Sequence, residues 1–117
     1  MLGDNGGSYQ YAADNILVNP GQYGVSIAGG SYNSIINNKV YAYKQSFTNV
    51  GVYVWGQAGS NVSHATVQDN AVNFTNSSGQ KNGDWLGSGE STPSGWNNNT
   101  WNSSISTSIL PSKLLDL

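Results

Sequence analysis

Two segments of the chain repeat one short pattern of glycine, valine and further apolar residues. Residues 24–27 (GVSI) match residues 51–54 (GVYV) at an offset of 27 residues. A second pair follows, in which residues 35–40 match residues 67–72 at an offset of 32 residues. One copy holds too few apolar residues to enclose a core by itself, so copies must stack to bury their apolar faces.

The repeated segments have the chemistry of strands. Runs at 16–18, 24–27, 39–41, 51–55 and 71–74 are short, rich in β-branched or aromatic residues, and often alternate apolar with polar side chains. No stretch between Asn15 and Phe74 spaces its apolar residues as a helix does. Gly, Asn and Ser separate the runs, as turns require. We therefore expect an all-β chain.

An asparagine stands directly before three of these strands, at Asn15, Asn38 and Asn70. Stacked asparagines can satisfy one another's amides between successive repeats, so these three are expected to form a ladder. The Ser31–Asn33 turn is aligned with the turn at Ser60 and Asn61, and the unequal offsets place an insertion chiefly around Lys44–Asn49.

This order of residues resembles the right-handed parallel β-helix repeat of the pectin-lyase-like superfamily, over about residues 12–76. The resemblance rests on Gly-Val-x-Ile/Val, the glycines and asparagine that follow it, and the asparagine before a valine strand. It implies a short right-handed parallel β-helix of two to three coils, as a C-terminal fragment or short member of that superfamily. The alternative architecture is a small antiparallel β-sandwich, which the same strands would allow.

We expect one domain over residues 1–117, with coils at 12–76, an irregular Trp/Gly/Asn-rich flap at 77–104 and a C-terminal cap at 105–117. Trp85, Trp96 and Trp101 would pin the flap to the coils. The expected inward-pointing residues are Ile16, Val25, Ile27, Ile35, Val40, Val52, Val54, Val67 and Val72.

Composition excludes several function classes. The 117 residues include 4 Lys, no Arg, 6 acidic residues, one His and no Cys, for a net charge of -2. Phosphate recognition needs more positive charge, so we expect no nucleic-acid partner. No apolar run reaches the roughly 20 residues of a membrane span. Without Cys and with one His, we expect no metal and no cofactor.

The resembled superfamily contains polysaccharide lyases, glycoside hydrolases and epimerases. The lyase mechanism uses an arginine base, which this chain lacks. The hydrolases need clustered Asp with a His, and His64 with Asp69 is the only such pair near a repeat strand, with Asp14 or Asp84 as further carboxylates. On an extended chain His64 and Asp69 fall on opposite faces. We interpret both as turn residues and assign no catalytic residue.

Aromatic residues carry the stronger functional signal. Tyr41 and Tyr43 alternate along one strand, and Tyr53 and Trp55 along another, so each pair shares a face. Facing outward, they would form a strip on which sugar rings stack; facing inward, or under the flap, they would be core. We favour the outward orientation, because the valines beside Tyr53 then fill a narrow interior.

These features favour a non-catalytic carbohydrate-contacting or structural β-helix module of an extracellular or cell-surface protein. The alternatives are a fragment of a polysaccharide-active enzyme of the β-helix class and an assembly element that forms oligomers by coil stacking. The expected partners are polysaccharide and further copies of the chain, or the remainder of a longer chain.

The absence of arginine predicts that the pure protein has no lyase activity. Incubation with pectate or alginate should release no unsaturated uronate product, measured by ultraviolet absorbance. Measurable product release by pure protein would contradict this prediction.

Overall fold

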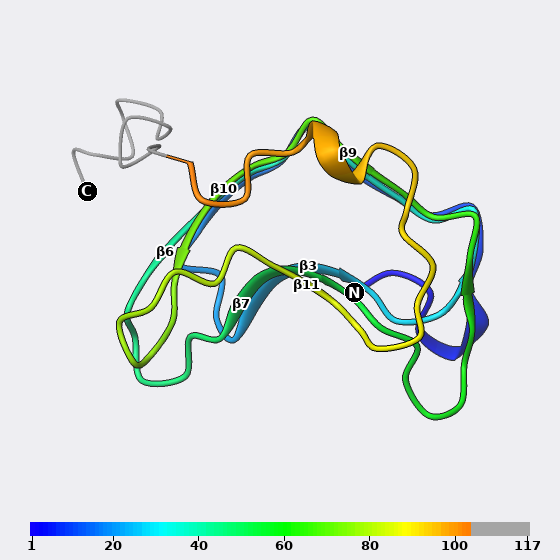
Figure 1. Ribbon diagram of the computed structural model, residues 1–117, viewed down its shortest axis with the longest axis horizontal. Coiled ribbons are helices and arrows are strands. Elements are labelled where there is room, and N and C mark those ends of the chain that lie inside the picture. Colours follow the sequence, from blue (N-terminus) through cyan, green and yellow to red (C-terminus); the bar gives the residue numbers. More distant parts are fainter. Residues whose placement is uncertain (104–117) are drawn as a thin grey trace.

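The computed structural model describes residues 1–103 and consists almost entirely of short strands (Figure 1). The strands are β1 (Tyr11–Ala13), β2 (Ile16–Val18), β3 (Tyr23–Ile27), β4 (Gly30–Ser31), β5 (Ser34–Ile36), β6 (Lys39–Tyr43), β7 (Val50–Val54), β8 (Val62–Ser63), β9 (Thr66–Gln68), β10 (Ala71–Thr75) and β11 (Asp84–Leu86). Two 3-10 turns accompany them, η1 (Asp4–Gly6) and η2 (Trp96–Asn98). In this part of the chain, no helix is long and apolar enough to span a membrane.

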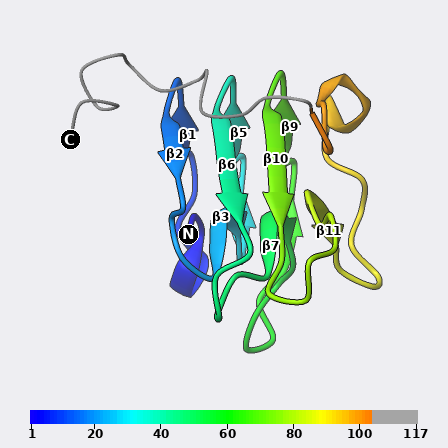
Figure 2. The same ribbon diagram turned by 90° about the vertical axis from the view of Figure 1, so that its left-hand side faces the viewer.

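The strands pair in parallel. Three sheets have the strand orders β1-β5-β9, β2-β6-β10 and β3-β7-β11, and β4 pairs with β8. Paired positions are 23, 27 or 32 residues apart, as in Ala12↔Ile35, Val25↔Val52 and Ile35↔Val67. Strands of one sheet overlie one another in Figure 1 and stand side by side in Figure 2. The predicted all-β class and parallel pairing are confirmed, and the antiparallel sandwich is wrong.

The predicted asparagine ladder is confirmed. Asn15 donates its backbone N–H and its Nδ2 to Oδ1 of Asn38, at 3.0 and 2.9 Å. Asn38 donates in the same way to Asn70, at 2.8 and 3.0 Å. Asn70 in turn donates to Asn99, at 3.0 and 2.8 Å, so the ladder has one member more than expected. Asn38 and Asn70 are buried, so these bonds satisfy amides that water cannot reach.

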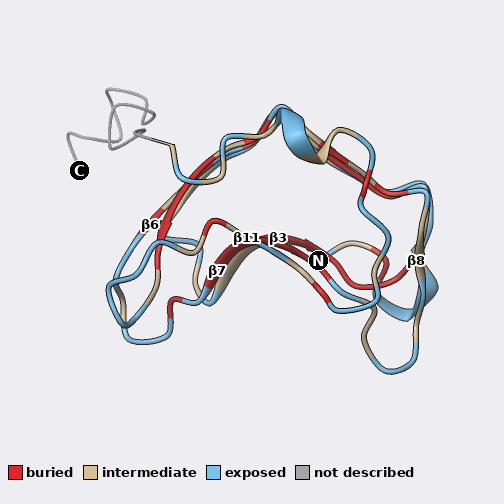
Figure 3. Ribbon diagram, viewed as in Figure 1, coloured by how far each residue is buried: buried red, intermediate tan, exposed pale blue. Residues whose placement is uncertain are grey.

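The core lies between the sheets, where Figure 3 shows buried residues along β3, β6 and β7. Eight of the nine predicted inward-pointing residues are buried: Val25, Ile27, Ile35, Val40, Val52, Val54, Val67 and Val72. The prediction for Ile16 is wrong, because it is 46% exposed and pairs with Lys39. Leu17 takes the inward position instead, in register with Val40. Three consecutive apolar residues do not show which of them faces inward.

One predicted alignment of the repeat is also wrong. Ser31 pairs with Ser63 rather than with Ser60. The backbone N–H of Tyr32 donates to the carbonyl of Ser63, so Tyr32 stands at the register position of His64. The insertion at 44–49 is confirmed as the loop that joins β6 to β7.

The region from 77 onward is more regular than the predicted flap. It contains β11, whose Trp85 pairs with Tyr53. Further along, Ser94 and Thr100 form parallel bridges to Thr66 and Ala71. Trp96 and Trp101 pack against each other and against the core, with ring centroids 4.6 Å apart. The expected cap at 105–117 lies outside the described residues.

We predict that Asn70→Ala destabilises the fold far more than Asn15→Ala. Removing the Asn70 side chain leaves the amide of Asn38 and the carbonyl oxygen of Ile35 without these partners in a buried place. The expected loss in free energy of unfolding is about 3 kcal/mol, measured by urea denaturation. Asn15→Ala is the matched control, because Asn15 is exposed at the ladder's end, and it should cost about 1 kcal/mol or less. Equal losses for the two variants would contradict a stabilising ladder.

Candidate functional site

Four aromatic side chains gather on the sheet β3-β7-β11. We call Tyr23, Tyr53, Trp55 and Trp85 the aromatic row. The Tyr53 ring lies 5.2 Å from that of Tyr23, edge to face, and 6.0 Å from that of Trp85. Trp55 lies 5.7 Å from Trp85. These rings stand on the outer face because the alternating side chains of the same strand, Val52 and Val54, point into the core.

The row combines a buried base with accessible edges. Tyr53 is only 7% exposed, and its hydroxyl accepts a hydrogen bond from Nε2 of Gln57 at 3.1 Å. Trp55 and Trp85 remain 42% and 44% exposed. The Trp55 indole lies over Gly87, where a Cβ atom would come within 2.4 Å of the ring. Glycine at 87 therefore leaves the space that the indole occupies.

A cleft of about 290 Å³ opens over the aromatic row. Its other walls are the amide side chains of Gln22, Asn49 and Gln57, together with Met1 and Val50. A second hollow of about 310 Å³ shares Asn49, Val50 and Trp85 with the first and reaches Asn82. No lining side chain of either hollow carries a charge. We call the two hollows together the cleft.

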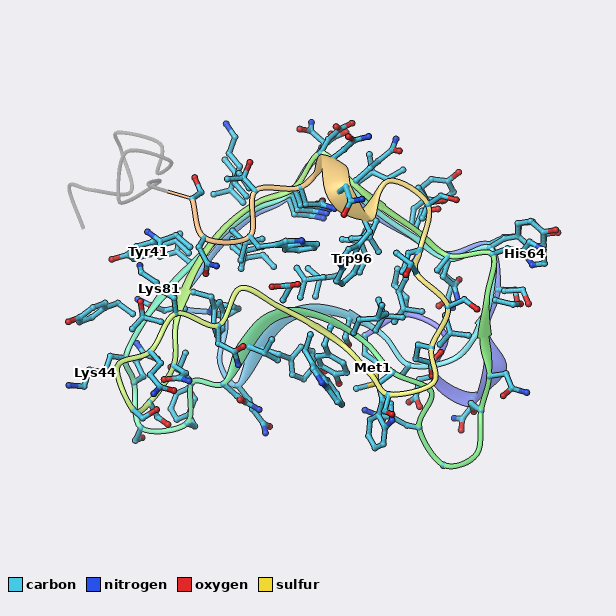
Figure 4. All side chains as sticks on the ribbon, in the orientation of Figure 1. Met1, Tyr41, Lys44, His64, Lys81 and Trp96 are labelled. Atoms are coloured by element: carbon cyan, nitrogen blue, oxygen red, sulfur yellow. The ribbon has the colours of Figure 1, made fainter. Side chains whose placement is uncertain are left out.

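The structure separates the two predicted aromatic pairs. Tyr53 and Trp55 line the cleft, whereas Tyr41 and Tyr43 lie on β6, which belongs to a different sheet. Tyr41 is half-buried beside Asn73, whose Oδ1 accepts a hydrogen bond from Nζ of Lys81. Figure 4 shows Tyr41, Lys44 and Lys81 on one side of the molecule. The four predicted residues thus form two surfaces instead of one strip.

His64 and Asp69 are not brought together. His64 stacks on Tyr32 at 4.5 Å and Tyr32 on Tyr9 at 5.1 Å, forming a column of exposed rings. Asp69 stands at the far end of β9, in the next bend of the chain. Both residues are exposed and have left-handed backbone angles, with φ of 53° and 60°, which is consistent with turn residues. Figure 4 shows His64 at the opposite end of the molecule from Tyr41.

The two further carboxylates lie apart from this pair. Asp14 accepts a hydrogen bond from Nδ2 of Asn37 at 2.7 Å. Asp84 pairs with Val52 and faces the same side of β11 as Leu86, which packs against the core. Burial raises the pKa of the Asp84 carboxyl above its ordinary value of 3.8. Within residues 1–103, no group of three or more His, Cys, Asp or Glu side chains could hold a metal ion.

Several residues of the cleft were missed in the sequence. Residues 83–86 (GDWL) match residues 51–54 (GVYV) at an offset of 32, and this third copy places Trp85 beside Tyr53. Tyr23 directly precedes the first copy of the pattern. Gln22, Asn49 and Asn82 carried no signal, because isolated amides before strands look like ordinary turn residues.

No family model, no curated protein and no solved structure matches this chain. Geometry and side-chain chemistry therefore carry the interpretation of the cleft.

We predict that Asp84→Asn stabilises the protein at neutral pH but not at acidic pH. Because the folded-state pKa of Asp84 is raised, the native state loses stability as pH rises from 3.8 through that folded pKa. The asparagine variant has no ionisation at this position and escapes the loss. Urea denaturation at pH 3 and pH 7 should show a stability gain over wild type only at pH 7. A gain that is independent of pH would contradict desolvation as the cause.

Proposed function

We propose that this chain is a non-catalytic carbohydrate-contacting module and that the cleft on β3-β7-β11 holds the sugar. The observation that carries this proposal is a cleft with an aromatic base and amide walls, without a charged side chain in its lining. Sugar rings present apolar C–H faces that pack on aromatic rings, and hydroxyls that pair with amides. Concave sites with apolar walls and few polar groups are typical of small-ligand binding.

The expected affinity is modest. A stacked ring pair adds on the order of 1 kcal/mol beyond area burial. Two or three such contacts give dissociation constants nearer to millimolar than to nanomolar. Binding of this strength suits a module that acts at many sites along a polymer, where repeated contacts raise the overall affinity.

The finer architecture belongs to the same proposal. We infer a right-handed parallel β-helix of two to three coils, similar to the pectin-lyase-like superfamily. Parallel pairing at offsets of 23, 27 and 32 residues and the asparagine ladder support it. The right hand follows from the strong preference of parallel crossover connections. The extracellular location and the assembly into oligomers or a longer chain stay predictions.

The test is affinity electrophoresis in gels that contain a soluble neutral polysaccharide, with hydroxyethyl cellulose, xylan and glucomannan in separate gels. Wild type should be retarded in at least one of them. Trp55→Ala should lose most of this retardation, with a dissociation constant raised about fivefold or more. Its melting temperature should change little, because the indole is 42% exposed.

Two matched variants serve as controls. Tyr11→Ala removes a 69% exposed ring from β1, outside the cleft, and should keep wild-type retardation. Tyr43→Ala tests the second aromatic surface and should also keep it. Loss of retardation in Tyr43→Ala but not in Trp55→Ala would move the binding surface to β6. The absence of retardation of wild type in all three gels would contradict the proposed function.

A further inference from the structure

The aromatic row crosses the strands instead of following one of them. Its members Tyr23, Tyr53 and Trp85 come from β3, β7 and β11, which are neighbours in one sheet. The centroid steps along them are 5.2 and 6.0 Å, close to the spacing of about 4.8 Å between paired strands. The row therefore runs perpendicular to the strands and offers one ring per strand.

A second row, of amides, runs beside the rings. Gln22, Asn49 and Asn82 stand just before β3, β7 and β11. The backbone N–H of Asn49 donates to the carbonyl of Gln22 at 2.8 Å, and Nδ2 of Asn82 donates to the carbonyl of Asn49 at 2.9 Å. Each strand thus contributes one amide at the same edge of the cleft, in step with the rings.

The two hollows extend along both rows. Gln22 lines the first hollow, Asn82 the second, and Asn49 both of them. Together they exceed the room that a single sugar ring needs. A ligand that uses every ring and every amide must itself repeat at the spacing of the strands.

On the basis of the proposed function, we propose that the cleft binds a linear, unbranched, neutral polysaccharide with extended β-1,4-type linkages. The polymer lies across the strands, with one sugar unit at each strand. Each unit places a ring face near an aromatic side chain and hydroxyls near an amide. An extended chain of pyranoses advances by about one strand spacing per unit, so successive units keep in step with the protein.

The distribution of charge favours a neutral polymer over an acidic one. The cleft lining offers no ammonium or guanidinium group to a carboxylate or a sulfate. Lys44 and Lys81 lie instead on the side of Tyr41, on another sheet (Figure 4). A carboxylated sugar chain would be desolvated in the cleft without gaining an ion pair.

The repeat distance also favours sugar over peptide. Proline-rich peptides bind aromatic grooves, but a polyproline helix advances only about 3.1 Å per residue. An extended peptide advances by about 3.3 Å per residue. Neither keeps one residue in step with one strand, whereas the rings and amides repeat together at the strand spacing.

The test is calorimetric titration of the full chain with β-1,4-linked oligosaccharides of glucose, xylose and mannose, from one to six units long. In the series that binds best, affinity should rise about fivefold with each added unit up to three or four units, and then level off. Trp85→Ala should make the affinity level off about one unit earlier, and Tyr11→Ala should follow the wild-type curve. Oligogalacturonates of equal length and a proline-rich peptide are measured beside them.

Each contrary result has a distinct meaning. Equal affinity for two and six units, with binding still lost in Trp55→Ala, overturns the inference and leaves the proposed function standing. Tighter binding of oligogalacturonate than of every neutral series overturns the neutral polymer. Tighter binding of the peptide than of any sugar overturns both proposals, as does the absence of binding to every oligosaccharide.

Discussion

The pairing of side-chain amides at Asn38 and Asn70 fixes the arrangement of the strands. Both side chains are buried, and each gives and receives hydrogen bonds across to the neighbouring repeat. An unpaired buried polar group costs about 1–3 kcal/mol. If β6 or β10 slipped by one residue, several such groups would lose partners at once. The ladder therefore sets the register of the sheets, and the outward residues of β7 and β11 align as a consequence.

The same alternation of side chains builds both the core and the cleft. Along β7, Val52 and Val54 fill the interior while Tyr53 stands on the outer face. Tyr53 is nevertheless almost fully buried, because Tyr23 and Trp85 from the adjacent strands pack against it. The cleft is thus a product of pairing between strands rather than of any single strand. Its rings hold one another in place, which reduces the entropy that a ligand must offset on binding.

Local patterns in the sequence predicted local structure well. The strand runs, the asparagines before strands and the inward valines follow from side-chain chemistry and a period of two, so they can be recognised in a single repeat. The error at Ile16 arose where three apolar residues in a row removed the alternation that would have oriented the strand. Ser31 was paired with the wrong serine because loop length between repeats is free to vary.

The candidate site was predictable only in part, for a related reason. Tyr53 and Trp55 were recognised from alternation, but their separation from Tyr41 and Tyr43 depends on the loop at 44–49, which carries the chain from one sheet to another. The amide edge of the cleft required the register of three strands at once. Residues that act by lining up across strands leave no trace in the short windows that show a strand.

The ladder also has a direction. Every amide in it donates toward the next repeat along the chain, from Asn15 to Asn38 to Asn70 to Asn99. The amide dipoles consequently add along the stack, as peptide dipoles add along a helix. The two ends of the stack are chemically unlike, one leading with acceptors and the other with donors. Two such stacks can continue each other's amide pairing only head to tail, and the fold gives the molecule a built-in polarity along the axis on which its repeats accumulate.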